Sequence, residues 1–335
     1  MALGRHGLKN NLYGEESEEK IKSGPEPHIL FARGDHMDNV QSVLQRVPKF
    51  ASATDMTVTE LMGGITNKNY KVIVGNEAFV VRLGGNDTKF LGIDRKTEFE
   101  CTRAASTVGI GPETIAYLEP EGYLVTRFIS GIGIPADQIG SRTNIQRVVE
   151  SMKLYHAIEY FPGFFSPFRV AEEYTKTAYS FNVKLPEKMD WYLEKSSEIE
   201  SAMYEREPLK IRPCHNDLLN ANFIDDGTRI RIIDWEYGGM GDIFFDLGNF
   251  AVQHEFNDEQ DEILLKAYFG NPTDSQRAHL KLMKIMSDLR ESMWGMVQIG
   301  VSKLDFDYVG YAQKYFDRYE ASVSGSDFQK WLQDV

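Results

Sequence analysis

The sequence predicts an α+β protein of two lobes: a small N-terminal lobe built on an antiparallel sheet and a larger, mainly helical C-terminal lobe. Three observations support this prediction. Residues 57–83 and 113–128 are rich in β-branched and aromatic residues separated by turn residues. Most of the chain after residue 143 has the apolar spacing of helices. The chain has 335 residues, and domains typically contain roughly 150, which favours two units.

Changes of pattern divide the chain into three predicted segments. Residues 1–36 are polar, rich in Gly and Glu and without periodicity, which predicts a flexible N-terminal extension. Residues 37–129 contain the predicted strands and form the N-lobe, and residues 130–335 form the C-lobe. The segment ISGIGIP at residues 129–135 interrupts the strand pattern and is predicted to be a hinge between the lobes.

The elements of the N-lobe follow from local spacing. Apolar residues from Val40 to Val47 recur at the spacing of a short amphipathic helix. Three strands are predicted within residues 57–83, where Gly and Asn mark the turns. A helix is predicted at about 93–108, because a Gly-x-x-Pro stop signal follows it, and two more strands are expected up to residue 128.

The C-lobe is predicted to be helical except for one β island at residues 209–234. There, two short apolar strands flank Asp226-Gly227, a dipeptide typical of a two-residue hairpin turn. Helical periodicity then predicts long helices at 258–269, 274–300 and 305–322.

Composition restricts the partners that the chain would bind. With 37 Lys and Arg against 50 Asp and Glu residues, the formal net charge is −13, which disfavours nucleic acid and anionic membranes but suits a cationic small molecule. No apolar run reaches the length of about 18 residues that a membrane span requires. The two cysteines, Cys101 and Cys214, are too few for a disulfide framework or a zinc site. We therefore expect a cytoplasmic protein without membrane insertion, and a homo-oligomer is an open possibility.

The strongest functional signal is a pair of motifs, CHNDLLNAN at residues 214–222 and IIDWEY at residues 232–237. If the Asp-Gly pair between them is the hairpin turn, Asn222 faces a residue near Arg231, and Asp234 lies just beyond at the open end. Asp217 lies in the loop that enters the hairpin. Three polar side chains are therefore expected to converge on one small volume.

These residue types suit phosphoryl transfer. Mg²⁺ prefers a few hard oxygen ligands and keeps room for substrate phosphates, which an Asn222 amide and an Asp234 carboxylate would allow. A nearby carboxylate outside the metal shell, Asp217, could accept the proton of a substrate hydroxyl as the catalytic base. His215 is expected to hold the loop through backbone hydrogen bonds. The plainer alternative is that Asp217 is a turn residue and that Asp234 ends a strand.

The two motifs resemble the paired signature of the aminoglycoside phosphotransferase and choline kinase superfamily, which shares its fold with protein kinases. The continuation FFDLGNF at residues 244–250 resembles the version found in choline/ethanolamine kinases. The resemblance implies a protein-kinase-like bilobal fold, with Asp217 as the base and with Asn222 and Asp234 holding Mg²⁺. It also places Asp246 on the substrate side, where it would support the catalytic loop or the metal shell.

The N-lobe would bind the nucleotide. Residues 63–69, GGITNKN, lie between two predicted strands and resemble the phosphate-binding loop of this superfamily. Gly64, Thr66 and Asn67 would approach the phosphate oxygens of ATP, because glycine admits close backbone contact and the two side chains can donate hydrogen bonds. A Gly-Gly hairpin turn explains the same residues equally well.

An arginine at the end of a strand is the second nucleotide candidate. This sequence resembles choline kinases in having an arginine at the position of Arg82. The planar guanidinium group of that arginine can donate hydrogen bonds to two phosphate oxygens. Its acidic partner would be Glu98 on the following helix, with Glu100 as the alternative. Residues 37–129 are thus the predicted nucleotide-binding lobe, and residues 130–335 are the predicted catalytic and substrate-binding lobe.

Aromatic residues near the C-terminus are candidates for the substrate site. Trp294 in a Trp-Gly pair, and Tyr308 and Tyr311 in an F-x-Y-x-x-Y-A-Q pattern, resemble the choline/ethanolamine branch. In that branch the rings surround the choline headgroup, and cation–π attraction supplies about 0.5–2 kcal/mol per ring. The periodicity by itself is equally typical of core packing.

Two acids, Glu236 and Glu255, could supply negative charge to such a site, and Tyr237 and Asp246 are its other predicted members. The sequence thus predicts a kinase that uses ATP and Mg²⁺ to phosphorylate the hydroxyl of choline or a related amino alcohol. The alternatives are a kinase for another small substrate, such as ethanolamine, thiamine, homoserine or an aminoglycoside, and a nucleotide-binding scaffold without catalysis.

Overall fold

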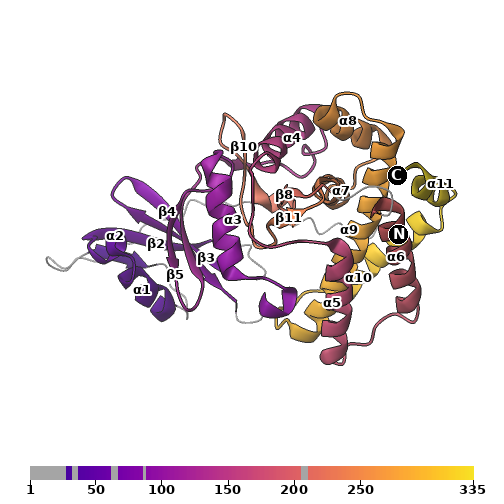
Figure 1. The fold of residues 1–335 in the computed structure, drawn as a ribbon. Helices are drawn as coiled ribbons and strands as arrows, with labels where there is room; N and C mark the ends of the chain where they lie inside the picture. The colour runs from indigo at the N-terminus through magenta and orange to yellow at the C-terminus, as the bar shows by residue number, and fades with distance from the viewer. Residues whose placement is uncertain (1–27, 32–36, 62–66, 86–87, 205–209) are drawn as a thin grey trace, which may run out of the picture. The chain divides into compact units, whose positions relative to one another are not determined.

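The computed structural model describes residues 28–31, 37–61, 67–85, 88–204 and 210–335 (Figure 1). The chain divides into two compact units. The first comprises residues 1–85 and 118–128, and the second comprises residues 86–117 and 129–335. The predicted α+β class is confirmed, because the first unit is built on a sheet and the second is mainly helical.

The sheet of the first unit is mainly antiparallel. Its strand order is β1-β2-β3-β4-β6-β5. The strands are β1 (His28–Phe31), β2 (Asp55–Leu61), β3 (Asn67–Val74), β4 (Glu77–Gly84), β5 (Thr114–Leu118) and β6 (Tyr123–Arg127). β1 runs parallel to β2, and the ladder from β2 through β3 and β4 to β6 is antiparallel. Alternate side chains, such as Phe79 and Val81 on β4, are buried, as expected for a sheet with one covered face.

Two short helices precede the sheet, α1 (Met37–Gln45) and α2 (Pro48–Ala51). Phe50 of α2 packs edge-on against Phe79 of β4, with ring centroids 5.3 Å apart. The apolar residues predicted to form the buried face of the first helix are all buried: Val40, Val43, Leu44 and Val47. The amphipathic helix and the strands predicted for this part of the chain are therefore confirmed.

Two features differ from the expectations for the N-terminal region. The four-residue strand β1 lies within residues 1–36, where an extension without regular structure was expected, and a strand that short has no readable alternation. Helix α3 (Arg95–Thr107) forms where it was predicted, and the Asp94 side chain caps it by accepting the Thr97 N–H at 2.7 Å. However, α3 groups with the second unit and not with the sheet.

The second unit is built around a 28-residue helix, α9 (Asp274–Val301). A capping box formed by Thr273 and Gln276 starts this helix. Helices α5, α7, α10 and α11 pack against it (Figure 1). The remaining helices of this unit, in chain order, are α4 (Arg142–His156), α5 (Pro167–Ser180), α6 (Met189–Tyr204), α7 (Ile243–Gln253), α8 (Asp258–Phe269), α10 (Tyr308–Val323) and α11 (Phe328–Asp334).

Short strands frame the region of the two motifs. β9 pairs with both β10 and β7, and β8 pairs with β11. These strands are β7 (Ile132–Gly133), β8 (Arg212–Cys214), β9 (Phe223–Asp225), β10 (Ile230–Ile232) and β11 (Gly239–Gly241). β7 lies inside the segment predicted to be a hinge, so part of that segment is fixed to the β9–β10 hairpin.

The β9–β10 hairpin has a longer turn than predicted. Asp225 pairs with Ile230, so the connection consists of residues 226–229 and is not the expected two-residue turn. The Asp226 carboxylate accepts the backbone N–H of Thr228 at 2.9 Å, which closes the wider loop. The pairing register therefore moves by two residues from the predicted one.

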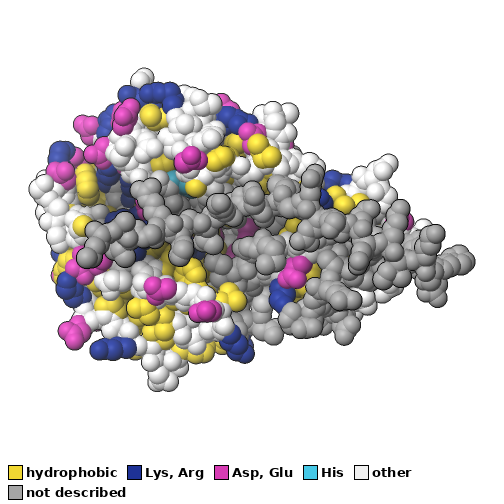
Figure 2. Space-filling view, turned by 180° about the vertical axis from the view of Figure 1, so that it is seen from behind, with side chains coloured by type: hydrophobic (Ala, Val, Ile, Leu, Met, Phe, Trp, Pro, Cys, Tyr) yellow, Lys and Arg dark blue, Asp and Glu magenta, His cyan; other side chains and the backbone are white. Residues whose placement is uncertain are grey.

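The surface agrees with the balance of charges in the sequence. On the face drawn in Figure 2, Lys and Arg side chains alternate with Asp and Glu, and the described residues form no continuous basic patch there. Among the helices that the structure describes, none has both the length and the apolar composition needed to cross a membrane.

Candidate active site

A buried carboxylate, Asp246 of α7, fixes the loop that follows β8. It accepts the backbone N–H groups of His215 at 2.9 Å and Asn216 at 2.6 Å, the Tyr155 hydroxyl at 2.6 Å and a hydrogen bond from His156 Nε2 at 3.0 Å. Because these bonds occupy its oxygens and its exposure is 0%, Asp246 supports the catalytic loop. The expected support of the loop by Asp246 agrees with these contacts, and its place among the predicted substrate residues stays a prediction that none of these contacts supports.

His215 has a structural position in this loop. Its Nε2 donates to the Ile233 carbonyl at 3.0 Å, and its Nδ1 accepts the Asp217 N–H at 3.2 Å. Its ring packs edge-on against Trp235, with centroids 4.6 Å apart. Burial lowers the pKa of His215, so the ring is neutral and orients the loop, as expected from the sequence.

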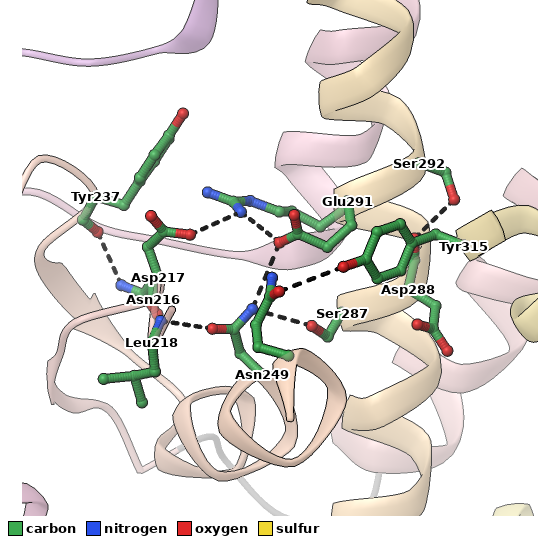
Figure 3. A network of polar contacts seen from close by, with 12 residues as sticks. Asn216, Asp217, Leu218, Tyr237, Asn249, Ser287, Asp288, Glu291, Ser292 and Tyr315 are labelled. Atoms are coloured by element: carbon green, nitrogen blue, oxygen red, sulfur yellow. Dashed lines mark hydrogen bonds and ion pairs between the residues drawn. The ribbon is translucent and has the colours of Figure 1, made fainter. Parts of the chain in front are cut away.

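Asp217 has the electrostatic environment of a catalytic base. Burial raises its pKa to about 7, Arg290 opposes this shift, and the charges of Glu291, Glu236 and Asp234 add to it. Its Oδ1 accepts a hydrogen bond from Arg290 Nη1 at 3.1 Å (Figure 3). A carboxyl group with a pKa close to neutral can accept a proton and release it again at physiological pH. The structure therefore brings Asp217, Asp234 and Glu236 into one electrostatic neighbourhood.

Arg290 of α9 is almost completely buried, at 2% exposure. Its Nη1 contacts both Asp217 and Glu291, and its guanidinium lies 4.4 Å from the centre of the Tyr237 ring. The remaining nitrogens, Nε and Nη2, are buried and have no hydrogen-bond partner in the described part of the chain. A buried donor without an acceptor costs about 1–3 kcal/mol, so a ligand that supplies acceptors here would recover that energy.

Glu291 extends the network to the aromatic residues. Its Oε2 accepts the Tyr311 hydroxyl at 2.6 Å, and its Oε1 receives a longer contact of 3.5 Å from Asn249. Asn249 also accepts the Leu218 N–H at 2.7 Å and donates to Ser287 at 3.1 Å, which joins α9 to the catalytic loop (Figure 3). Arg290, Glu291 and Asn249 were not predicted as site residues. Charged and polar neighbours such as Asp288 and Ser292 flank the Arg-Glu pair on α9, so the pair does not differ from a solvent-facing part of the helix in the sequence.

Asn222 and Asp234 leave the hairpin at the same end. The Asn222 carbonyl accepts the Ile233 N–H at 3.0 Å, so Asn222 lies opposite Ile233 and not near Arg231 as predicted. The Asn222 Nδ2 donates to the Asp217 carbonyl at 2.9 Å, which directs Oδ1 to the opposite side of the amide. Asp234 follows Ile233 directly and has a left-handed backbone conformation, with φ 67°. In the observed pairing register, the two candidate metal ligands, Asn222 and Asp234, lie closer to each other along the hairpin than in the predicted register.

The predicted aromatic residues are clustered. The Trp294 ring lies 5.9 Å from Tyr308 and 5.4 Å from Tyr311, between ring centroids. Phe306 contacts both tyrosines, with centroids 4.8 Å from Tyr308 and 6.0 Å from Tyr311. Tyr311 also donates to Glu291, as described above. The rings thus form one cluster that is connected through Glu291 and Arg290 to Asp217.

Known proteins share both the sequence pattern and the fold. The profile of the choline/ethanolamine kinase family matches residues 58–272. The chain belongs to the choline/ethanolamine kinase family. Protein LicA of Haemophilus influenzae is 26% identical over 245 residues, which cover 70% of this chain and 70% of LicA. Human ethanolamine kinase 1 is 25% identical over 326 residues, which cover 83% of this chain and 70% of that enzyme.

Solved structures support the same assignment. A choline/ethanolamine kinase family protein from Mesorhizobium loti superposes with a TM-score of 0.76 at 30% identity, covering 89% of this chain and 98% of that one. The aminoglycoside phosphotransferase APH(4)-Ia shares the fold, with a TM-score of 0.61 at 17% identity over 86% of this chain and 100% of that one. The expected protein-kinase-like fold is confirmed. The chain is a phosphotransferase that acts on an alcohol group, a small-molecule kinase with an amino alcohol acceptor.

The two acids that were expected to supply negative charge to the substrate site, Glu236 and Glu255, differ in their surroundings. Glu236 is buried, and its carboxylate lies 3.2 Å from Arg95. Glu255 lies at the surface, where it pairs with Lys314 at 2.7 Å. Glu291, for which no role was predicted, is buried and contacts the aromatic cluster through the Tyr311 hydroxyl. Glu291 is therefore a further candidate for the negative charge that had been expected from Glu236 or Glu255.

The nucleotide candidates are described only in part. Gly64 and Thr66 lie outside the described residues. Asn67 begins β3, and Arg82 lies on β4 opposite Asn69. Glu98, in the second unit, is 1% exposed and pairs with Arg95 at 2.7 Å. The alternative acid, Glu100, pairs with Arg103 in an exposed ion pair, and the contribution of Arg82 to nucleotide binding stays a prediction.

Proposed function

We propose that this chain transfers the γ-phosphoryl group of ATP to the hydroxyl of choline or ethanolamine, with Asp217 as the base. The observation that carries the proposal is the buried Asp217, whose pKa is raised to about 7, connected through Arg290 and Glu291 to a cluster of aromatic rings. A solved structure of a protein named LicA, which is 22% identical to this chain with a TM-score of 0.70, contains AMP, and this supports an adenine nucleotide as the donor.

Asp217 would act on the acceptor hydroxyl. As the hydroxyl oxygen attacks the γ-phosphorus, Asp217 accepts the proton, and its near-neutral pKa suits that transfer. His215 and Asp246 hold the backbone of the loop through hydrogen bonds. The Asp217 carboxylate would therefore be in position before each catalytic cycle begins.

The donor set at the hairpin end fits a magnesium site. Asn222 Oδ1 and the Asp234 carboxylate are the hard oxygen ligands that Mg²⁺ prefers, and two protein ligands leave coordination positions for water and phosphate oxygens. When bound, Mg²⁺ would supply positive charge to the phosphates during transfer. Asn222 would contribute its oxygen because its nitrogen is already engaged with the Asp217 carbonyl.

The aromatic cluster and Glu291 would hold the amino group of the acceptor. Rings from Trp294, Tyr308 and Tyr311 attract a cation through their faces, and Glu291 places a carboxylate at the edge of the cluster. A compact monocation matches this arrangement better than an aminoglycoside, whose several ammonium groups would each need an acid.

An assay of ADP release over choline, ethanolamine, thiamine, homoserine and kanamycin tests this function. We expect turnover with choline or ethanolamine, and we expect Asp217→Asn to lower kcat by at least about 10²-fold, as for other lost general bases. Asp226→Asn is the matched control, because that carboxylate caps the hairpin turn. Near-wild-type turnover by a folded Asp217→Asn enzyme, or turnover with none of the amino alcohols, would contradict the proposal.

A further inference from the structure

Two of the three guanidinium nitrogens of Arg290 lack a hydrogen-bond partner among the described residues. Its Nε and Nη2 lie on the same edge of the guanidinium plane, and both are buried without a hydrogen-bond partner among the residues that the structure describes. The opposite nitrogen, Nη1, already contacts Asp217 at 3.1 Å and also contacts Glu291. The Cζ atom lies over the Tyr237 ring, 4.4 Å from its centre, and these contacts together restrain the group. Arg290 thus presents one rigid, unused pair of N–H donors beside the catalytic base.

An edge of this kind matches two oxygens of one oxyanion. The parallel N–H groups of a guanidinium bind a carboxylate or a phosphoryl group in two-point contact, whereas a single hydroxyl or carbonyl satisfies only one donor. Arginine has no acceptor atom and stays charged, so the missing partner must accept hydrogen bonds. The ligand of this edge is therefore an anionic group with at least two terminal oxygens.

The reaction brings such a group next to Asp217. For proton transfer, the acceptor hydroxyl must lie within about 2.6–3.2 Å of the Asp217 carboxylate. That hydroxyl oxygen then forms a bond to the γ-phosphorus, the bond from phosphorus to the bridging oxygen of ADP breaks, and Asp217 takes the proton. The terminal oxygens of the transferred group are bonded to the same phosphorus, and Arg290 Nη1 lies 3.1 Å from Asp217 Oδ1, so these oxygens would come within reach of the Arg290 side chain.

We propose that Arg290 binds the phosphoryl group during its transfer, and the phosphate of the product, through Nε and Nη2. The proposal rests on the function proposed above. The competing source of an oxyanion is a carboxylate on the acceptor itself. Choline and ethanolamine carry no carboxylate, so the acceptors proposed here do not supply this oxyanion. In a phosphoryl-transfer reaction, the oxyanion that comes next to the base is the transferred phosphoryl group.

The kinetic test uses a variant that keeps the positive charge at position 290 but lacks the paired N–H donors of the guanidinium group. Arg290→Lys leaves a cation between Asp217 and Glu291 but removes the paired donors. We expect kcat to fall by about 10²-fold or more, with KM for the acceptor within about threefold, because the lost contact acts on the transferring group. Arg318→Lys is the matched control, since Arg318 also pairs with an acid, Asp288, and stacks on a tyrosine, Tyr315, on the neighbouring helix.

Binding of product separates this role from a structural one. By calorimetry, we expect Arg290→Lys to bind phosphocholine and phosphoethanolamine at least about tenfold more weakly than wild type, with choline and ethanolamine binding unchanged. Equal losses for the alcohols and their phosphate esters, or no loss for either, would overturn the proposal. This measurement needs no turnover, so the inference can fail while the proposed function stands. A failure of the proposed function is seen separately, as absence of turnover by the wild-type enzyme with any amino alcohol.

Two further results complete the test. If wild type prefers serine or homoserine over amino alcohols and Arg290→Lys loses that preference, the oxyanion belongs to the acceptor and the proposal is wrong. A crystal structure of the wild-type enzyme with phosphocholine covers the case in which the variant does not fold. The phosphate must then contact Nε and Nη2 of Arg290, and a phosphate bound by other groups would overturn the inference.

Discussion

At the scale of single residues, the motifs predict candidate reactive groups but not the groups that surround them. Asp217, Asn222 and Asp234 are candidates because carboxylates and an amide at that spacing suit a metal and a base. Arg290 and Glu291 lie in the middle of a long helix, where charged side chains normally face solvent. Only the packing of α9 against the catalytic loop buries both, each at 2% exposure.

The aromatic cluster gives a prediction about a single ring. Trp294→Ala should raise KM for choline by about 2- to 30-fold, which corresponds to the loss of about 0.5–2 kcal/mol of cation–π attraction. The effect on ethanolamine should be smaller, because its ammonium is more strongly hydrated and carries no methyl groups. Tyr308→Phe is the control, since it keeps the ring and removes only the contact with Ser302. Unchanged KM values for both substrates in Trp294→Ala would exclude the cluster from substrate binding.

His254 gives a prediction about pH. Burial lowers its pKa to about 4, while the hydrogen bond from Nδ1 to the Phe250 carbonyl opposes the shift. The unfolded chain takes up this proton near pH 6.5 and the folded chain only near pH 4. His254 therefore contributes stability above pH 6.5 that is lost as the pH falls towards 4, by about 3 kcal/mol at most.

Urea unfolding of wild type and His254→Gln between pH 7 and pH 4 measures this contribution. The difference in unfolding free energy between the two proteins should shrink as the pH falls. An NMR titration that finds the His254 ring protonating near pH 6.5 in the folded protein would rule this account out.

At the scale of secondary structure elements, periodicity predicted which elements form but not how they connect. The strands of the first unit and the helices α8, α9 and α10 occur where apolar spacing indicated them. The β9–β10 turn was misread because an Asp-Gly pair favours a two-residue turn, whereas Asp226 caps a four-residue one. The strands β7 and β11 have only two and three residues, which is too short for any alternation to be seen.

The contact between α7 and α9 gives a prediction at this scale. A methyl group added at Gly248 would lie 2.9 Å from the Met283 carbonyl carbon and 3.0 Å from the Lys284 nitrogen, both backbone atoms that cannot rotate away. Gly248→Ala should therefore force the two helices apart and lower the free energy of unfolding by about 1–3 kcal/mol. Gly133→Ala is the control, because a methyl group there meets nothing within 4 Å.

Denaturant unfolding of both glycine variants provides the measurement. Since α7 carries Asp246 and Asn249, and α9 carries Arg290 and Glu291, we also expect Gly248→Ala to lower kcat even when the protein is fully folded. A Gly248→Ala protein as stable and active as Gly133→Ala would show that this helix contact can relax without effect.

At the scale of the whole molecule, the chain combines a general fold with particular side chains. The family profile matches residues 58–272, which include most of the sheet unit and the part of the helical unit that precedes α9. Within the helical unit, the proposed base, the candidate metal ligands and the aromatic cluster all come from segments near β8–β10, α9 and α10. The resemblance of the motifs was enough to predict this class of enzyme, but the Arg290–Glu291 pair depends on tertiary packing and could not be read from spacing.

The most direct measurement is a crystal structure with a non-hydrolysable ATP analogue and Mn²⁺ in place of Mg²⁺, with the ion located by its anomalous signal. The account predicts an ion bound by Asn222 Oδ1 and an Asp234 oxygen, with the Asp217 carboxylate free of the metal and open to an acceptor hydroxyl. An ion bound by other groups, with Asn222 and Asp234 directed away from the phosphates, would contradict it.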